Sequence, residues 1–103
     1  MELTKILRPA AVKVIASASS TKRLLHGLGE AAQSAYGIRA SVAVEALMER
    51  ESLGPTGVGH GVALPHARLR DLEHVVGAFI RLEKPVDFDS VDRQPVDLAF
   101  ALF

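Results

Sequence analysis

The chain has 103 residues, the length of one small domain, and hydrophobic residues make up 49% of it. Twelve Lys and Arg balance twelve Asp and Glu, so the formal net charge is zero and neither nucleic acid nor an anionic membrane surface is an expected partner. There is no cysteine, which excludes disulfides, thiolate catalysis and cysteine zinc sites. We see no signal peptide and no apolar run near the ~18 residues of a spanning helix, and therefore expect a cytoplasmic protein without membrane insertion.

The first third of the chain predicts a helical turn, a strand and a helix. Residues 3–7 read as the helical turn, and residues 12–15 as a short edge strand. Residues 17–21 offer several N-cap candidates for a helix that Gly37 is well placed to end. Its apolar residues recur at steps of one, three and four, which keeps one face apolar. They are Leu24, Leu25, Leu28, Ala31, Ala32 and Ala35.

The remainder predicts one more helix and then strands. The helix starts near Ala40 and stops at Gly54. Residues 75–82 and 96–103 are apolar runs rich in strand formers, separated by Glu83-Lys84-Pro85 and an acidic stretch. This order predicts an α/β domain of mixed α+β type, with a central mixed β-sheet flanked by helices.

The two predicted strands are apolar on consecutive residues, so both faces of the sheet need cover. Two helices from the first half can cover one face only. Because the sequence ends on Phe103 inside an apparent central strand, we expect a domain without its C-terminal helices, or one covered by a partner chain. The last strand would then expose an apolar edge and face, which favours a homo-oligomer.

The most informative segment is residues 53–68, which combines glycines with a histidine after a proline. Four glycines leave backbone amides uncovered; they are Gly54, Gly57, Gly59 and Gly61. Together with the histidine and nearby arginines, these amides predict a site that accepts an anion, although an ordinary loop remains the alternative. No Gly-Lys-Ser/Thr closes the segment and no dinucleotide fingerprint frames it.

His66 is the candidate nucleophile. Pro65 fixes its own φ and favours an extended Leu64, so the imidazole emerges from a stiff segment. A neutral imidazole has one nitrogen free to act as a nucleophile near pH 7. Its other nitrogen must donate a proton to a neighbour that the sequence does not identify. A hydrogen-bonded structural histidine is the alternative.

Other side chains near this segment could hold an anion or a metal. Arg50 and Arg68 flank it and can bind phosphoryl oxygens, their alternative being solvated surface charges, and Thr56 could add a hydroxyl donor. His60 and His66 match no common metal spacing and have no third ligand. The aspartates at 87, 89 and 92 lack the glycine and glutamate of a calcium loop. We expect neither a metal nor a cofactor.

Several of these segments match a known family. Arg50-Glu51 followed by residues 54–66, together with residues 86–102, resembles the enzyme IIA domains of the mannitol/fructose class. These domains belong to the bacterial phosphoenolpyruvate-dependent phosphotransferase system. Both stretches and residues 3–7 are most similar to its nitrogen-regulatory branch. The resemblance covers nearly the whole chain.

The resemblance implies that His66 takes a phosphoryl group from a phosphohistidine on a small carrier protein, and that Arg50 helps to hold the phosphoryl oxygens. Further donors are expected from Thr56 and the amides of Gly57, Gly59 and Gly61, without magnesium, with His60 and Arg68 as auxiliary residues. Nitrogen-branch members report their phosphorylation state to regulatory targets, including potassium transport and sensor proteins. Sugar-specific members pass the group to a cysteine of a IIB domain.

Two departures from the family pattern bear on activity. Ala67 stands where many relatives have glycine. The family domain also continues beyond residue 103 with closing helices and a second active-site histidine, so residues 1–103 would form one domain truncated at its C-terminal end. Without that histidine, transfer would be impaired. Two alternatives therefore stay open: a partner-binding module that is never phosphorylated, and a sugar-specific IIA component of a transport system.

Overall fold

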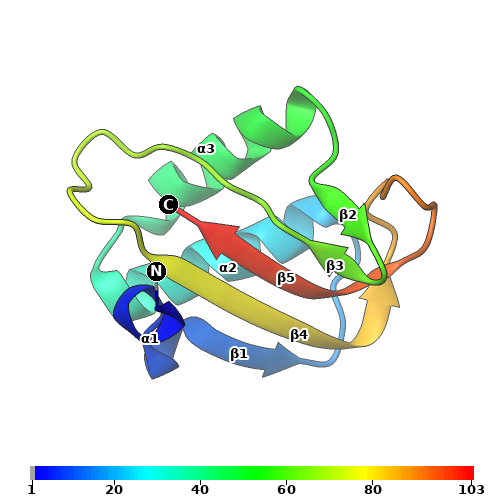
Figure 1. Ribbon diagram of the computed structural model, residues 1–103, viewed down its shortest axis with the longest axis horizontal. Coiled ribbons are helices and arrows are strands. Elements are labelled where there is room, and N and C mark those ends of the chain that lie inside the picture. The colour runs from blue at the N-terminus through cyan, green and yellow to red at the C-terminus, as the bar shows by residue number, and fades with distance from the viewer. Residues whose placement is uncertain (1) are drawn as a thin grey trace.

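Helices dominate the first half of the chain and strands the second, as the sequence predicts. The computed structural model describes residues 2–103 and has the mixed α+β architecture expected (Figure 1). Its elements, in chain order, are α1 Leu3–Ile6, a 3₁₀ turn Pro9–Ala11, β1 Val12–Ile15, α2 Thr21–Tyr36, α3 Ala40–Ser52, β2 Gly57–Gly59, β3 Val62–Ala63, β4 Gly77–Val86 and β5 Val96–Leu102. None of the helices within residues 2–103 has the length and apolarity needed to cross a bilayer.

The five strands form one mixed sheet in the order β1-β4-β5-β3-β2. β1 is parallel to β4, and β3 is parallel to β5, whereas the β4–β5 and β2–β3 pairs are antiparallel. β1 is an edge strand, as predicted. The expectation of a free edge on the last strand is wrong, because β5 is central and pairs on both sides with β4 and β3. β5 therefore has no free edge with which a second copy could pair.

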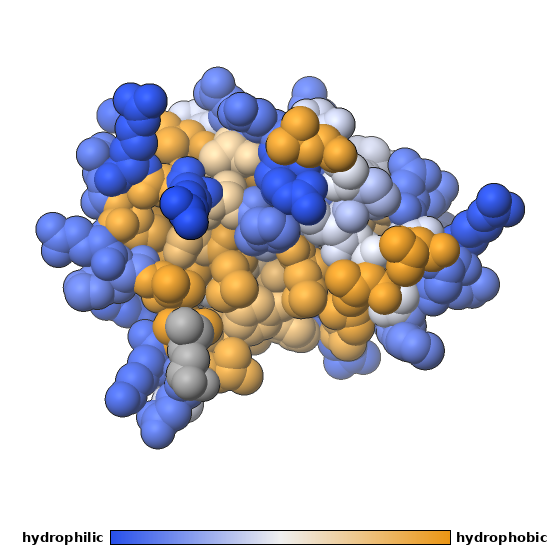
Figure 2. Space-filling view, turned by 45° about the horizontal axis from the view of Figure 1, so that its top comes forward, coloured by the Kyte–Doolittle hydropathy of each residue, from blue (hydrophilic) through white to orange (hydrophobic). Residues whose placement is uncertain are grey.

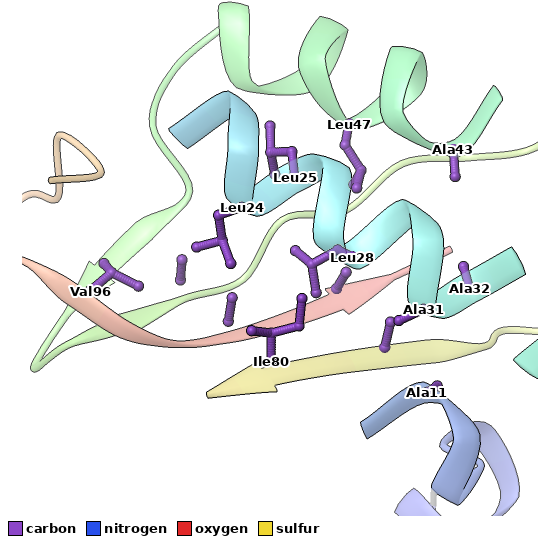
Figure 3. Close-up of a cluster of buried hydrophobic side chains, with 14 of the residues drawn as sticks. Ala11, Leu24, Leu25, Leu28, Ala31, Ala32, Ala43, Leu47, Ile80 and Val96 are labelled. Carbon is purple, nitrogen blue, oxygen red and sulfur yellow. The ribbon is translucent and has the colours of Figure 1, made fainter. Parts of the chain in front are cut away.

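Local signals set the limits of α2. The side chain of Ser20 accepts a hydrogen bond from the backbone N–H of Arg23, and Gly37 ends the helix with a φ of 72°. The predicted apolar stripe of α2 packs on the sheet and on α3, as Figure 3 shows. The largest fully buried residues in this core include Leu24, Leu25, Leu28, Leu47 and Ile80.

Two strand predictions need correction. β4 does not stop before Glu83-Lys84-Pro85 but continues through them to Val86. Lys84 N–H donates to the carbonyl of Ala16, while the β4–β5 register shifts between Arg81 and Val86, an irregularity that tolerates proline. The glycine-rich segment, predicted as a loop, contains the β2–β3 hairpin, which glycines with low strand propensity concealed.

One face of the sheet has no helix over it within residues 2–103. Direct cross-strand partners share a face, which places Val12 beside Phe79 and Phe79 beside Phe100 on this open side. Val14, on the same face, is 58% exposed. Figure 2 shows apolar residues gathered across one broad side of the molecule, with polar residues around them. The uncovered apolar face and the central position of the last strand are thus as expected.

Candidate functional site

Backbone hydrogen bonds on both sides of His66 hold this residue against the central strand. His66 follows β3 and forms a parallel bridge with Leu102 of β5. The N–H of Leu102 donates to the carbonyl of Pro65, and the N–H of Ala67 donates to the carbonyl of Leu102, both at 3.0 Å. Pro65 is buried whereas His66 is exposed. The imidazole is therefore presented to solvent from a stiff segment.

The contacts of the His66 ring agree on one tautomer. Nδ1 lies 3.1 Å from the carbonyl oxygen of Leu64, which can only accept a hydrogen bond, so Nδ1 carries the proton. Nε2 lies 3.2 Å from Nε of Arg50, which can only donate, so Nε2 presents a lone pair. These two contacts fit a ring that carries its proton on Nδ1 and a lone pair on Nε2. Leu64 is the neighbour that the sequence did not identify.

Arg50 reaches this histidine from the last turn of α3. Besides its Nε contact, its Nη1 donates to the carbonyl oxygen of Gly54 at 3.0 Å, which fixes the plane of the guanidinium. Within residues 2–103, Nη2 makes no hydrogen bond. The structure therefore brings Arg50 and His66 together and leaves a charged donor beside Nε2, where it could bind an anion.

Thr56 is buried, and its side chain binds Glu51. Its hydroxyl donates to Oε1 of Glu51 at 2.5 Å, and its backbone N–H donates to Oε2 at 3.0 Å. The hydroxyl proton is thus committed, and the pair ties the end of α3 to the start of β2. Glu51 had no assigned role in the sequence, although a carboxylate five residues before a threonine, across Gly54 and Pro55, is a spacing that could have suggested this contact.

The glycine-rich turn lies far from His66. His60 and Gly61 have φ values of 56° and 79°, as a two-residue hairpin turn requires. From that turn the chain stays in one constant register with β5 as far as His66. Five residues at about 3.3 Å each place Gly61 about 16 Å from His66. The structure therefore does not bring Gly59, His60 and Gly61 to the histidine.

Close packing explains the glycines of the hairpin better than anion binding. A Cβ at Gly57 would overlap the Ser90 hydroxyl, and one at Gly61 would lie 2.9 Å from a carboxylate oxygen of Asp97. At Gly59 it would lie 3.2 Å from Oδ2 of Asp92. The hairpin thus needs small residues so that the segment from residue 87 to residue 97 can pack against it.

Asp92 holds this segment on the hairpin. Its Oδ2 accepts from the backbone N–H of His60 at 2.9 Å, and its Oδ1 accepts from the N–H of Gln94 at 3.0 Å. These hydrogen bonds, that of His60 foremost, lower the pKa of the Asp92 carboxyl. Asp87 similarly accepts from the N–H of Asp89, so these aspartates act as turn formers. Within residues 2–103, no three His, Asp or Glu side chains gather as metal ligands.

Arg68 is exposed two residues after His66. It lines a groove between α3 and residues 68–72, together with Arg39 and Glu49. No hydrogen bond joins it to His66 in the described part of the chain. Among the predicted residues, Arg50 alone makes a side-chain hydrogen bond with His66 in the described part of the chain, Thr56 lies beside Leu64, and Gly59, His60 and Gly61 lie at the far end of the hairpin.

Comparison with known proteins identifies the class that this fold and site define. Residues 5–103 match the family described as phosphoenolpyruvate-dependent sugar phosphotransferase system, EIIA 2. The chain belongs to this family.

Its relatives include proteins of the nitrogen-regulatory branch. The chain is 42% identical over 102 residues to a nitrogen regulatory protein of Bradyrhizobium diazoefficiens, a match that covers 99% of the chain and 67% of that protein. The crystal structure of nitrogen regulatory protein IIA-Ntr from Neisseria meningitidis superposes with a TM-score of 0.87 at 38% identity, over 95% of this chain and 67% of that one.

A more distant solved structure shares the fold. It is the enzyme IIAMtl of Escherichia coli, in complex with phosphorylated enzyme IIBMtl, with a TM-score of 0.78 at 17% identity, over 94% of this chain and 70% of that one. Across the nitrogen regulatory relatives, the chain spans about two thirds of their length or slightly less, between 63% and 67%.

Proposed function

We propose that the protein is a phosphoryl relay with a regulatory role, in which Nε2 of His66 accepts a phosphoryl group from a phosphohistidine carrier protein. The observation that carries this proposal is the pair of contacts on the His66 ring. The carbonyl of Leu64 holds the Nδ1 proton, while the lone pair of Nε2 accepts a hydrogen bond from Nε of Arg50. Family membership supports a phosphoryl-transfer chemistry for such a site.

The transfer is balanced without any movement of protons. The bond between phosphorus and the donor imidazole breaks while a bond between phosphorus and Nε2 of His66 forms. The donor starts as a phosphoimidazolium and leaves as a neutral imidazole, whereas His66 starts neutral and becomes the phosphoimidazolium. The carbonyl of Leu64, 3.1 Å from Nδ1, stabilises the positive charge that the ring gains. Because both partners are imidazoles, the step is close to thermoneutral and reversible.

Arg50 supplies the charge that the phosphoryl oxygens need. Its Nε lies 3.2 Å from Nε2 and its Nη1 is held by the Gly54 carbonyl, so Nε–H has only to turn from the Nε2 lone pair to an oxygen of the incoming PO₃ group, which frees Nε2 to attack. Thr56 contributes by position: its hydrogen bonds to Glu51 fix the segment that carries Gly54. The hairpin glycines 59 and 61 lie too far away to donate to the same oxygens.

The identity of the relatives favours a regulatory output over sugar transport. Nitrogen regulatory proteins match 99% of the chain at about 40% identity, whereas a fructose-specific EIIABC component matches 56% of it. We therefore place the phosphorylation state of His66 upstream of regulatory target proteins in the cytoplasm. The sugar-specific alternative, transfer to a IIB domain, draws on fructose-specific relatives that match 56% and 58% of the chain.

Intact-mass measurement tests the acceptor residue. The protein is incubated with phosphoenolpyruvate and the upstream carriers, and one acid-labile phosphoryl group is expected on the wild type and none on His66→Ala. His60→Ala is the matched control, because His60 is also exposed but lies at the hairpin turn. Labelling that persists in His66→Ala would exclude His66, and a wild type that gains no mass would favour the binding-module alternative.

A further inference from the structure

The outer edge of β1 pairs with no further strand of the described chain, whereas the opposite edge of the sheet, at β2, is covered in part by the segment that follows β4. Within residues 2–103, β1 pairs only with β4, and Figure 1 shows no strand beside its lower edge. At the other edge, the carbonyl of Gly57 in β2 accepts a bond from Val91 N–H at 3.5 Å, and His60 N–H is held by Asp92. A free strand edge presents main-chain donors and acceptors to a further strand.

The two sides of β1 differ in chemistry. Val12 and Val14 face the open side of the sheet and are 42% and 58% exposed. Lys13 and Ile15 pair with Ile80 and Leu82, which lie on the side covered by α2. An added strand would therefore meet apolar side chains on one of its faces and a basic lysine on the other.

A groove of about 350 Å³ runs between β1 and α2 on the lysine side. Its polar walls carry Lys13, Arg23, His26 and Glu30, and its floor includes the buried Ile80. The one ion pair within residues 2–103 joins Glu2 to Lys5, so Glu30 does not neutralise either groove cation by direct contact. The groove therefore has an unpaired positive charge next to an open strand edge.

We propose that this edge binds an extended segment of another protein, whose side chains alternate between apolar and acidic. Its main chain hydrogen-bonds β1, its apolar residues cover Val12 and Val14, and its carboxylates enter the groove towards Lys13 and Arg23. The site lies three strands away from β3 and so is separate from His66. It would give the protein a partner surface independent of phosphorylation.

Charge disfavours a second copy of the chain as the occupant. Two β1 strands related by a two-fold axis would bring Lys13 and Arg23 of one copy towards the same residues of the other. Like charges facing each other across a strand pair are destabilising. A lysine on an edge strand ordinarily disfavours the addition of another strand. With an acidic segment, however, Lys13 can form an ion pair and so select for that partner.

The test is an NMR titration of the protein with the blocked peptide Ac-Ser-Val-Glu-Val-Glu-Val-Ser-NH₂. We expect saturable amide shifts confined to β1 and the first half of α2. The same peptide with lysines in place of glutamates, and the glutamate peptide with N-methylated valines, should both fail to bind. Lys13→Glu combined with Arg23→Glu should weaken binding about tenfold or more, whereas two charge reversals outside the groove should not.

The matched control is Lys22→Glu combined with Arg39→Glu, which makes the same change in net charge at exposed residues outside the groove between β1 and α2. Phosphoryl acceptance by His66 should be unchanged in the Lys13/Arg23 variant, so the two proposals fail separately. Equal weakening by both variants, undiminished binding of the N-methylated peptide, or absence of saturable shifts up to millimolar peptide would each overturn the proposal. Concentration-dependent shifts of β1 without peptide would assign the edge to a second copy and overturn it too.

Discussion

Glu51 and Thr56 are joined by two hydrogen bonds that bridge the turn between α3 and β2. Both carboxylate oxygens are occupied, one by the Thr56 hydroxyl and one by its backbone N–H. The residue before Glu51 is Arg50, whose Nη1 donates to Gly54 inside the bridged turn. The carboxylate therefore fixes the geometry of the loop on which the guanidinium is oriented.

Replacing Thr56 by valine should destabilise the protein. Valine keeps the shape but removes the hydroxyl, which leaves Oε1 of Glu51 without its donor beside a residue that is only 5% exposed. We expect the free energy of unfolding to fall by about 1–3 kcal/mol. Urea denaturation followed by circular dichroism measures it, with Thr4→Val on exposed α1 as the control. Equal effects of the two substitutions would contradict the proposed role of the bridge.

Replacing Arg50 by lysine should separate charge from geometry at the site. Lysine keeps the positive charge but has no fork that can reach Nε2 of His66 and the Gly54 carbonyl together. We expect phosphoryl transfer from the phosphorylated carrier to slow about 100-fold, with little loss of stability. Single-turnover kinetics measure the rate. Arg39→Lys, at the exposed start of α3, is the control, and a rate that drops equally there would remove Arg50 from the mechanism.

Much of the helical part of the fold could be predicted because its signals are local. Ser20 and Gly37 stand at the ends of α2 with the residue types that caps require, and the apolar spacing between them has one interpretation. The strands were harder to predict. The apolar run at residues 96–103 correctly indicated a central strand, but no local pattern reports its partners, β4 and the parallel β3, which is distant in sequence.

At the candidate site, too, local features could be predicted from the sequence whereas contacts between distant residues could not. Pro65 correctly indicated a stiff presentation of His66, but spacing alone did not bring Arg50, sixteen residues earlier, to its Nε2. Position beside the glycine-rich segment made Arg50 a candidate together with Arg68, and the family resemblance favoured Arg50. The hairpin glycines suggested anion binding because the sequence gives no sign of the segment that packs on them from residues 87–97. Their small size serves that packing.

Gly29→Ala should destabilise the protein by crowding the contact between the two long helices. A Cβ at Gly29 would lie 2.5 Å from Cγ2 of Val44 and 3.2 Å from the backbone oxygen of Ala40 on α3. We expect a loss of about 1–3 kcal/mol from overpacking, greater than the gain in helix propensity. Adding Val44→Ala should recover part of it. Gly27→Ala is the control, since its nearest atom is the flexible end of Ile80, and an equal loss there would contradict this explanation.

Acidification should loosen the hairpin from its covering segment through Asp92. The backbone N–H groups of His60 and Gln94 lower the pKa of this carboxyl in the folded protein relative to the unfolded chain. The carboxylate therefore contributes stability that is fully present above the unfolded pKa and is lost as the pH falls through the lower, folded pKa.

This loss of stability on acidification should depend on the Asp92 carboxylate. In Asp92→Asn the contribution is absent at every pH, so stability should fall less on acidification than in the wild type. The amide proton of His60, followed by NMR from neutral to acidic pH, should shift as Asp92 takes up its proton, and this shift should vanish in the variant. Asp71→Asn, an exposed aspartate in another loop, should behave as the wild type. A His60 amide that titrates identically in Asp92→Asn would show that a different group controls the hairpin.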